Sequence, residues 1–498
     1  MTAPARFLRG PNRWSLRPVL ELDSPALAAR VLDLQILCGC RNLQLHGPAV
    51  EYEDEDVARA CLRTALSGGP TEPLREFAAD VRLGPNTRAL FEAARRRNIP
   101  VRRLGQGSLL LLGHGIRQRR LWGARSDATS SIGEAIGWEK PLAKVILAAA
   151  GIPTPEGFVA ETAPDAIAAL RAINAPVVVK PESANHGRSV FIGLSTEEEV
   201  AAAFQAASRE GDSPRVIIER LIPGREHRVL VVGGRLAAAS RGDPLYVQGD
   251  GVRTLQQIVD EVNLDPRRGP ADECPLYPVE FDDVTLAHLA RLGFTPASVV
   301  PAGTRVLLQL NGNLGVDVTG AVHPANIDLC LFAAEAIGLD IAGIDLVVED
   351  ISQPIAAQGG AVLEVNAMPG LMMHLNPAAG SPRPVDDIIL RHLYPHDPAG
   401  RIPIACVLDD PETARALHSA LLAKGLRSGL GSGADLLLHP RLEAAVFHLT
   451  SASIAAEGLP FDACDVAVMR APAHPVLAKV SRRVLSPDQG LSAALAAL

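Results

Sequence analysis

Apolar residues recur every three or four positions in several segments, which is typical of amphipathic helices. Residues 54–66 (DEDVARACLRTAL) and 72–83 (EPLREFAADVRL) show this spacing on either side of a Gly-Gly-Pro break. Residues 139–150 show it again and are followed by Gly151 and prolines, a common helix stop. We therefore predict a helix in each segment.

Short apolar runs between these segments predict buried strands. The runs are PVVVKP (176–181), RVLVV (228–232), IAGIDLVV (341–348) and AVLEV (361–365). Gly233-Gly234 predicts a tight hairpin turn after the second run. A helix is expected from about 326 to 337, ending at Gly338. Mixed strands and helices predict an α/β (α+β) fold.

Length and composition indicate a globular protein of several domains. A chain of 498 residues, 47% of them hydrophobic, can bury large cores. It contains no apolar run of about twenty residues and no leader-like apolar segment at its start, so we expect no membrane association. The net charge of -8 gives no general attraction to nucleic acid. Seven scattered cysteines predict reduced thiols and a cytoplasmic location.

Three oxygen-bearing side chains predict a metal site. Side chains two apart on a strand face the same way, so Glu364 and Asn366 share one side of the AVLEVN segment. Asp345, in the preceding apolar strand, is placed to join them. Oxygen ligands of this kind suit Mg²⁺, which shares its coordination with substrate phosphates. The alternative is that the two acids are only solvated strand ends.

The lysines are few and clustered. Only five of the 48 basic residues are lysine, and Lys140, Lys144 and Lys180 lie within about forty positions. This favours sites that need a compact ammonium group. The glycine-bearing segment 184–194 (ANHGRSVFIGL) matches neither the GxxxxGK[ST] phosphate loop nor a Rossmann fingerprint. It could fold over polyphosphate with backbone N–H groups, or be an ordinary hairpin turn.

These motifs, taken in order, resemble the ATP-grasp superfamily of carboxylate-amine ligases and, more narrowly, the cyanophycin synthetase family. The resemblance rests on LRGPNRWS, KPESANHGRSV, IIERLIPGREHRVLVV, DGVRTLQQIVDEVNLDPRRG, GLDIAGIDLV and EVNAMPG, and covers residues 8 to about 395. It implies an N-terminal domain at 1–125, shortened relative to the family, and an ATP-grasp catalytic domain at 126–398. Residues 399–498 resemble a truncated muramyl-ligase-like domain.

The resemblance implies ATP and Mg²⁺ as cofactors and assigns a role to each matching residue. The expected ATP contacts are Lys144, Lys180, Ser183, His186, Gly187, Arg188, Glu219, Ile222 and Glu226. The expected Mg²⁺ ligands are Asp345, Glu364 and Asn366. The expected contacts to an amino-acid or peptide substrate are Ser130, His227, Arg228, Arg267 and Arg268.

Two departures from the family bear on activity. Gln309 stands where an arginine is expected to face the acyl phosphate, and a neutral amide cannot offset charge there. Arg305 or Arg188 could replace that arginine. After residue 400 the family's GTNGKTTT-type phosphate loop is absent, so the third domain is expected to carry no nucleotide chemistry and to serve subunit contact.

We therefore expect an ATP-dependent ligase that joins a carboxylate to an amine on amino acids or short peptides. Polymerisation of β-aspartyl-arginine dipeptides and a single ligation remain open as forms of this activity. A catalytically silent relative that binds nucleotide or peptide and regulates a full-length synthetase is the alternative. The family implies a homo-oligomer, a dimer or a tetramer.

Overall fold

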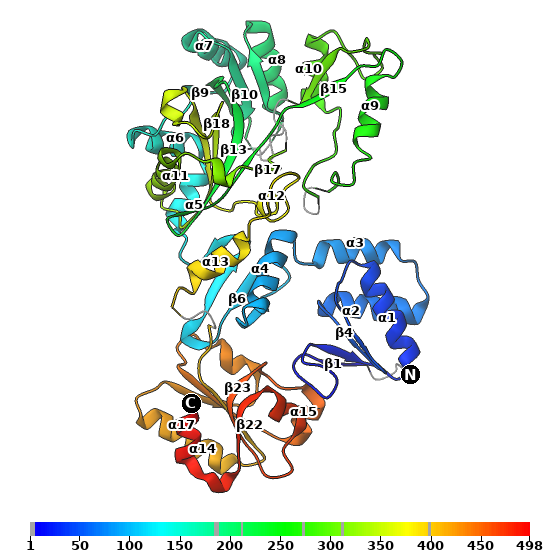
Figure 1. Ribbon diagram of the computed structural model, residues 1–498, viewed down its shortest axis with the longest axis vertical. Helices are drawn as coiled ribbons and strands as arrows, with labels where there is room; N and C mark the ends of the chain where they lie inside the picture. Colours follow the sequence, from blue (N-terminus) through cyan, green and yellow to red (C-terminus); the bar gives the residue numbers. More distant parts are fainter. Residues whose placement is uncertain (1–4, 184–188, 211–212, 271–273, 310–312, 397–399) are drawn as a thin grey trace. The chain divides into compact units, whose positions relative to one another are not determined.

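The computed structural model describes all residues except 1–4, 184–188, 211–212, 271–273, 310–312 and 397–399 (Figure 1). The chain forms two compact units. One comprises residues 1–84, 91–121 and 394–498, and the other comprises residues 85–90 and 122–393. We call them the discontinuous unit and the central unit. The C-terminal segment therefore groups with the N-terminal residues.

The central unit begins with a four-stranded antiparallel sheet in the order β11-β10-β12-β9. Helices α7 and α8 pack against it through apolar residues such as Leu170, Val200 and Phe204. The elements are β9 (Gly157–Ala160), α7 (Ala163–Ile173), β10 (Val177–Pro181), β11 (Phe191–Leu194), α8 (Glu197–Ala207) and β12 (Val216–Arg220). Because these helices cover one face, the other face is left to present polar side chains.

A five-stranded antiparallel sheet in the order β17-β14-β13-β18-β19 forms the second half of the central unit. Its apolar face packs on α6 and α11, where Leu147, Cys330, Ile344 and Val365 are fully buried. The elements are α5 (Ser131–Trp138), α6 (Lys140–Ala149), β13 (Arg225–Val232), β14 (Arg235–Arg241), β17 (Val316–Asp317), α11 (Pro324–Ile337), β18 (Ile341–Val348) and β19 (Ala361–Asn366). Strand β18 lies between β13 and β19 and is buried along almost its whole length.

A smaller layer of the central unit packs two helices around a two-stranded sheet, with its own apolar core that includes Leu255, Leu289 and Val306. Its elements are β15 (Leu245–Gln248), α9 (Leu255–Val262), α10 (Asp283–Arg291) and β16 (Arg305–Gln309). The remaining elements of the unit are η2 (Thr319–Ala321), η3 (Ile355–Ala357), α12 (Met372–Leu375) and α13 (Val385–Leu393).

The first part of the discontinuous unit is a sheet in the order β1-β2-β4-β3 covered by three helices. Its elements are β1 (Arg6–Leu8), β2 (Val19–Glu21), α1 (Pro25–Leu37), β3 (Leu45–His46), β4 (Ala49–Glu51), α2 (Glu55–Ser67) and α3 (Glu72–Val81). The chain continues through α4 (Pro85–Arg96), β5 (Val101–Arg103), β6 (Leu109–Leu112), η1 (Gly115–Arg117), β7 (Arg119–Trp122) and β8 (Arg125–Ser126).

The C-terminal part of the discontinuous unit is a parallel sheet in the order β21-β22-β20-β23-β24. Apolar cores lie on both faces, as parallel sheets require. The elements are β20 (Ile404–Leu408), α14 (Pro411–Ala423), β21 (Ser428–Gly431), η4 (Ala434–Leu438), β22 (Ala444–Leu449), α15 (Ser451–Glu457), β23 (Cys464–Val468), α16 (Pro475–Val480), β24 (Ser481–Leu485), η5 (Pro487–Gln489) and α17 (Gly490–Ala497).

The sequence-based prediction of a mixed α/β fold is confirmed, and so are its main elements. The predicted helices correspond to α2, α3, α6 and α11, and α11 ends at Gly338 with φ 86°. The predicted hairpin joins β13 to β14 through Gly233 and Gly234, both at positive φ. The seven cysteines all lie among the described residues and form no disulfide bond. Among the described residues, no helix combines the length and apolar character needed to cross a membrane.

Candidate active site

The first cluster of charged side chains lies on the sheet that contains β10 and β12. Val178 and Glu219 are paired across these strands, so Glu219 and Lys180 share one face of the sheet. The Nζ of Lys180 lies 2.9 Å from Oε2 of Glu219. Lys144, from α6, pairs with the other oxygen of the same carboxylate. One buried carboxylate therefore holds two ammonium groups in place.

Burial controls the protonation of both lysines. It lowers the pKa of Lys180 to about 8, because a charged ammonium is disfavoured away from water. It also lowers the pKa of Lys144 well below its ordinary value, and repulsion from the Lys180 ammonium adds to this effect. An additional anion beside the two amines would favour their charged forms. The two lysines are thus suited to binding an anionic ligand.

The second cluster lies on the five-stranded sheet. Asp345 of β18 is paired with Arg228 of β13 on one side and with Glu364 of β19 on the other. The Arg228 guanidinium binds Asp345 through two nitrogens, and the Nη2–Oδ2 distance is 2.8 Å. The Asn366 side chain donates to Oδ2 of Asp345 at 3.0 Å. Asp345, Glu364 and Asn366 are therefore brought together, as the period-two strand pattern predicted.

Carboxylates are in excess around Asp345. Burial, followed by repulsion from Asp345, raises the pKa of Glu226 to about 7. Burial and the neighbouring Glu364 raise the pKa of Asp345, against the opposing effect of Arg228. Burial alone would lower the pKa of Arg228, but Asp345, Glu364 and Glu226 outweigh it and raise that pKa. One guanidinium does not satisfy three acidic groups, so the cluster has the electrostatics of a cation site.

The residues present fit a magnesium ion. The donor set is two carboxylates and an amide, all oxygen ligands, and it lies close enough to Lys180 for Glu364, Glu226 and Asp345 to affect that amine. Among the described residues there is no group of three or more His, Cys, Asp or Glu side chains that could hold a metal ion. A hard cation would thus need further oxygens from a ligand, as Mg²⁺ commonly takes from phosphates.

Lys140 is a charged member of the site to which the sequence assigned no role. It begins α6, and its Nζ lies 3.8 Å from Oε2 of Glu364. It therefore connects the lysine-bearing helix to the carboxylate cluster. The clustering of three of the five lysines in one stretch was the signal that could have identified it.

The other residues expected to contact the nucleotide differ in whether the structure describes them. Ser183 is exposed two residues after the end of β10, and Ile222 is half-buried in the bend between β12 and β13. The remaining expected contacts of the glycine-bearing loop, His186, Gly187 and Arg188, lie outside the described residues.

The residues expected at the substrate are spread more widely. Ser130 caps α5 by accepting from the Gly133 N–H at 3.2 Å. His227 is 1% exposed and, because strand side chains alternate, points to the face opposite Arg228. Burial lowers its pKa to about 4.

The two arginines of the DPRRG segment have partners of their own. The exposed Arg267 pairs with Asp265 at 2.7 Å. Arg268 donates to the Tyr277 carbonyl at 2.8 Å. These contacts lie within the segment that follows α9.

The two described residues expected to aid catalysis lie on the two-stranded sheet. Arg305 is exposed at the start of β16 and stacks over Tyr246, 4.3 Å from the ring centroid. Gln309 ends the same strand, half-buried and paired with Leu245. Arg305 is therefore engaged by an aromatic ring rather than by the carboxylate cluster.

A third group of polar residues lies beside Arg228, and the sequence did not indicate it. Arg383 pairs with Asp317 at 2.7 Å, and Thr319 donates to the same carboxylate at 2.6 Å. His374 of α12 is 2% exposed, and burial together with the positive charge of Arg228 lowers its pKa to about 3. The Asp317–Arg383 pair joins residues 66 positions apart, which no local pattern reveals.

Comparison with known proteins shows which families the chain resembles. Residues 138–231 match the sequence model of the ATP-grasp domain. The chain is 35% identical to a cyanophycin synthetase of Trichormus variabilis over 428 residues, which are 80% of this chain and 47% of that protein. It is 31% identical over 272 residues to the glutathione biosynthesis bifunctional protein GshAB of Streptococcus thermophilus, covering 53% of this chain and 36% of that one.

A solved bifunctional glutathione synthetase from Pasteurella multocida aligns with a TM-score of 0.46 at 25% identity, covering 68% of this chain and 49% of that one. The chain spans about half the length of the cyanophycin synthetases that it matches. The matched segment 138–231 contains α6, β10, β12 and most of β13, and so the elements that carry Lys144, Lys180, Glu219 and Arg228. Residues 138–231 therefore belong to an ATP-grasp domain, and the chain is similar over four fifths of its length to cyanophycin synthetases.

Proposed function

We propose that the protein is an ATP-dependent ligase that forms an amide bond between a carboxylate and an amine. The observation that carries this proposal is the meeting of two opposite sets of charges in the central unit. Lys180 of β10 and Lys144 of α6 form the cationic set, and Asp345 of β18 and Glu364 of β19 form the acidic set. An enzyme that activates a carboxylate with ATP needs cations for phosphates and oxygen ligands for a metal in one place.

Each residue has a role that follows from its position. Lys144 and Lys180 would hold phosphate oxygens, exchanging part of their contact with Glu219 for the nucleotide. Asp345, Glu364 and Asn366 would hold Mg²⁺, with Lys140 restraining Glu364. Bound Mg²⁺ supplies charge neutralisation on the phosphates during transfer of a phosphoryl group to the carboxylate. Arg228 fixes Asp345 from the opposite strand and limits its rotamers.

The substrate class that we propose is amino acids or short peptides. Relatives that the chain matches are named for synthesis of cyanophycin and glutathione, both built through amide bonds. One form of the activity is polymerisation of β-aspartyl-arginine dipeptides at this single site, and the other is one ligation that yields a small peptide.

The test is ATP-dependent phosphate release, with mass spectrometry of the products formed from mixed amino acids and dipeptides. We expect release to require an amine and a carboxylate substrate. Asp345→Ala or Glu364→Ala should lower the rate by about two orders of magnitude, because each removes a charged ligand of the Mg²⁺ that neutralises the reacting phosphates. Glu349→Ala, at the exposed end of β18, is the matched control and should retain the rate.

Two results would reject the proposal. One is phosphate release that is unaffected by loss of Asp345 and Glu364. The other is ATP-dependent thermal stabilisation of the wild-type protein with no product under any substrate mixture.

A further inference from the structure

The parallel sheet of the discontinuous unit carries a pocket far along the chain from the ATP-grasp segment. The pocket has a volume of about 270 Å³ and lies where β21 and β22 end and α14 begins. Its lining residues are Pro411, Ala414, Arg415, Leu430, Gly431, Ser432 and His448. Ligands of open α/β sheets bind outside the carboxyl ends of the strands, and the pocket occupies that position.

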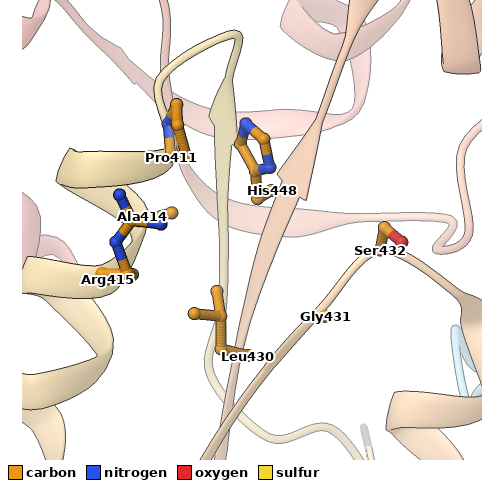
Figure 2. Close-up of a pocket in the computed structure, with 7 residues that line it drawn as sticks. All are labelled: Pro411, Ala414, Arg415, Leu430, Gly431, Ser432 and His448. Carbon is orange, nitrogen blue, oxygen red and sulfur yellow. The ribbon is translucent and has the colours of Figure 1, made fainter.

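The polar groups of this pocket are donors. Figure 2 shows the His448 ring between the helix that carries Arg415 and the loop that carries Ser432. The Nε2 atom of His448 is buried and has no hydrogen-bond partner in the described part of the chain. Arg415 is exposed, and the described residues give its guanidinium no ion pair. A guanidinium, an imidazole and a hydroxyl can all donate to one oxyanion.

None of the described residues that line the pocket is acidic. Of the acids nearest in sequence, Glu412 is exposed on α14, and Asp410 and Asp409 have partners of their own. Asp410 caps α14 by accepting from the Thr413 N–H at 3.0 Å and from its hydroxyl at 2.8 Å. Asp409 accepts from the Ser451 hydroxyl at 3.0 Å. In the described part of the chain, Asp410 and Asp409 are therefore engaged by hydroxyl and backbone donors rather than by the donors of the pocket.

The loop after β21 contributes a hydroxyl to the pocket. Ser432 is exposed and lies between Gly431, which pairs with Phe447 of β22, and Gly433, beside which the Asp435 carboxylate lies. Leu430 and Pro411 supply an apolar wall to the pocket.

We propose that this pocket binds a small molecule through a carboxylate or phosphate group. The volume is below that of pockets for drug-sized ligands, about 300–1,000 Å³, so the ligand is a small metabolite rather than a nucleotide or a peptide chain. Arg415 and His448 hold the oxyanion, Ser432 adds a hydroxyl donor, and the apolar wall contacts the carbon skeleton. The site belongs to residues 411–448 and does not depend on the proposed ligase activity.

Isothermal titration calorimetry on the full chain tests the proposal, with inorganic phosphate and succinate as separate probes at ionic strength fixed by potassium chloride. The variants Arg415→Ala and His448→Phe should each weaken binding about tenfold or more, because each removes a donor to a charged group. Arg441→Ala and His439→Gln are the matched controls, since both residues are exposed in the same sheet domain and outside the pocket. Lys180→Ala separates this binding from phosphate held by the ATP-grasp lysines and should leave it unchanged.

The two probes identify the source of the oxyanion. Binding of phosphate alone indicates a phosphorylated ligand, and binding of succinate alone indicates a carboxylate. The proposal is overturned if neither probe binds, or if Arg441→Ala weakens binding as much as Arg415→Ala. It is also overturned if Lys180→Ala abolishes all the binding measured. Circular dichroism and the thermal midpoint of each variant establish that it is folded.

Discussion

At the scale of single residues, the Arg228–Asp345 ion pair determines the charge balance of the site when no ligand is bound. Asp345 is 7% exposed, and its two oxygens are occupied by Arg228 and by Asn366. A buried pair of this kind adds little net stability, but removal of one partner leaves an uncompensated charge. Arg228 therefore holds a carboxylate cluster that a metal ion would otherwise need to neutralise.

We predict that Arg228→Met lowers the free energy of unfolding of the ligand-free protein by about 3–5 kcal/mol, because Asp345, Glu226 and Glu364 lose their common cation. Mg²⁺ alone should then raise the thermal midpoint of the variant by more than that of the wild-type protein. Differential scanning fluorimetry across a Mg²⁺ titration measures both effects.

The matched control is Arg225→Met, which lies on the same strand but is exposed and pairs with Asp243 at 3.4 Å. It should change neither quantity. Equal responses of the two variants to Mg²⁺ would show that Arg228 has no special relation to the cation site.

At the scale of elements, Asp340 ties together three segments of the central unit. It lies in the turn between α11 and β18 and accepts from Ser126 at 2.6 Å and from Thr129 at 2.7 Å. It also contacts His392 of α13 at 3.3 Å. Burial alone would raise the pKa of Asp340, but these three hydrogen bonds outweigh it and lower the pKa to about 2.

A lowered pKa stabilises the folded state above the unfolded pKa, near 3.9, and the stabilisation is lost as the pH falls towards 2. We predict that Asp340→Asn costs about 2 kcal/mol of unfolding free energy at pH 7 and about half of that at pH 3. Urea unfolding at the two pH values measures the difference. Asp328→Asn, an exposed position on α11, should cost nothing measurable at either pH. A cost for Asp340→Asn that does not change with pH would contradict the assignment.

The predicted elements differ in how far their local sequence determines them. Helix α11 ends at Gly338 because a residue at φ 86° is most easily a glycine, and the two-glycine turn between β13 and β14 follows the same reasoning. The convergence of Glu364 and Asn366 followed from strand periodicity alone. These features needed only neighbours in sequence.

Features that depend on the pairing of distant strands could not be predicted from the local sequence. Arg228 meets Asp345 because β13 and β18 pair in one register, and these residues are 117 positions apart. The same register turns His227 away from that cluster. No periodicity within one segment specifies which strand will become its neighbour.

At the scale of the whole molecule, residues 394–498 complete the discontinuous unit. Residues 91–121 of the same unit form hydrogen bonds directly with this segment. The Ile116 N–H donates to the Leu442 carbonyl at 2.8 Å, and the Gln118 side chain donates to the Leu437 carbonyl at 2.9 Å. Arg401 donates to the Asn98 carbonyl at 3.1 Å.

We predict that a chain ending at Leu393 loses protection in residues 91–121 while residues 122–393 stay resistant, because only the discontinuous unit loses partners for its backbone. Limited proteolysis with mass spectrometry of the fragments locates the cuts, and the full chain under the same conditions is the reference. Unchanged protection of residues 91–121 would show that this segment is stable without its C-terminal partner.

The order of the units along the chain also has a consequence for biosynthesis. A ribosome makes the first 121 residues, then the whole of segment 122–393, and only afterwards the strands that complete the discontinuous unit. Because domains fold as units while the nascent chain emerges, the ATP-grasp segment can fold before the residues that complete the discontinuous unit have been made. Until residues 394–498 have been made, the apolar surface that they cover stays exposed, and so their synthesis determines how long the nascent chain is prone to aggregation.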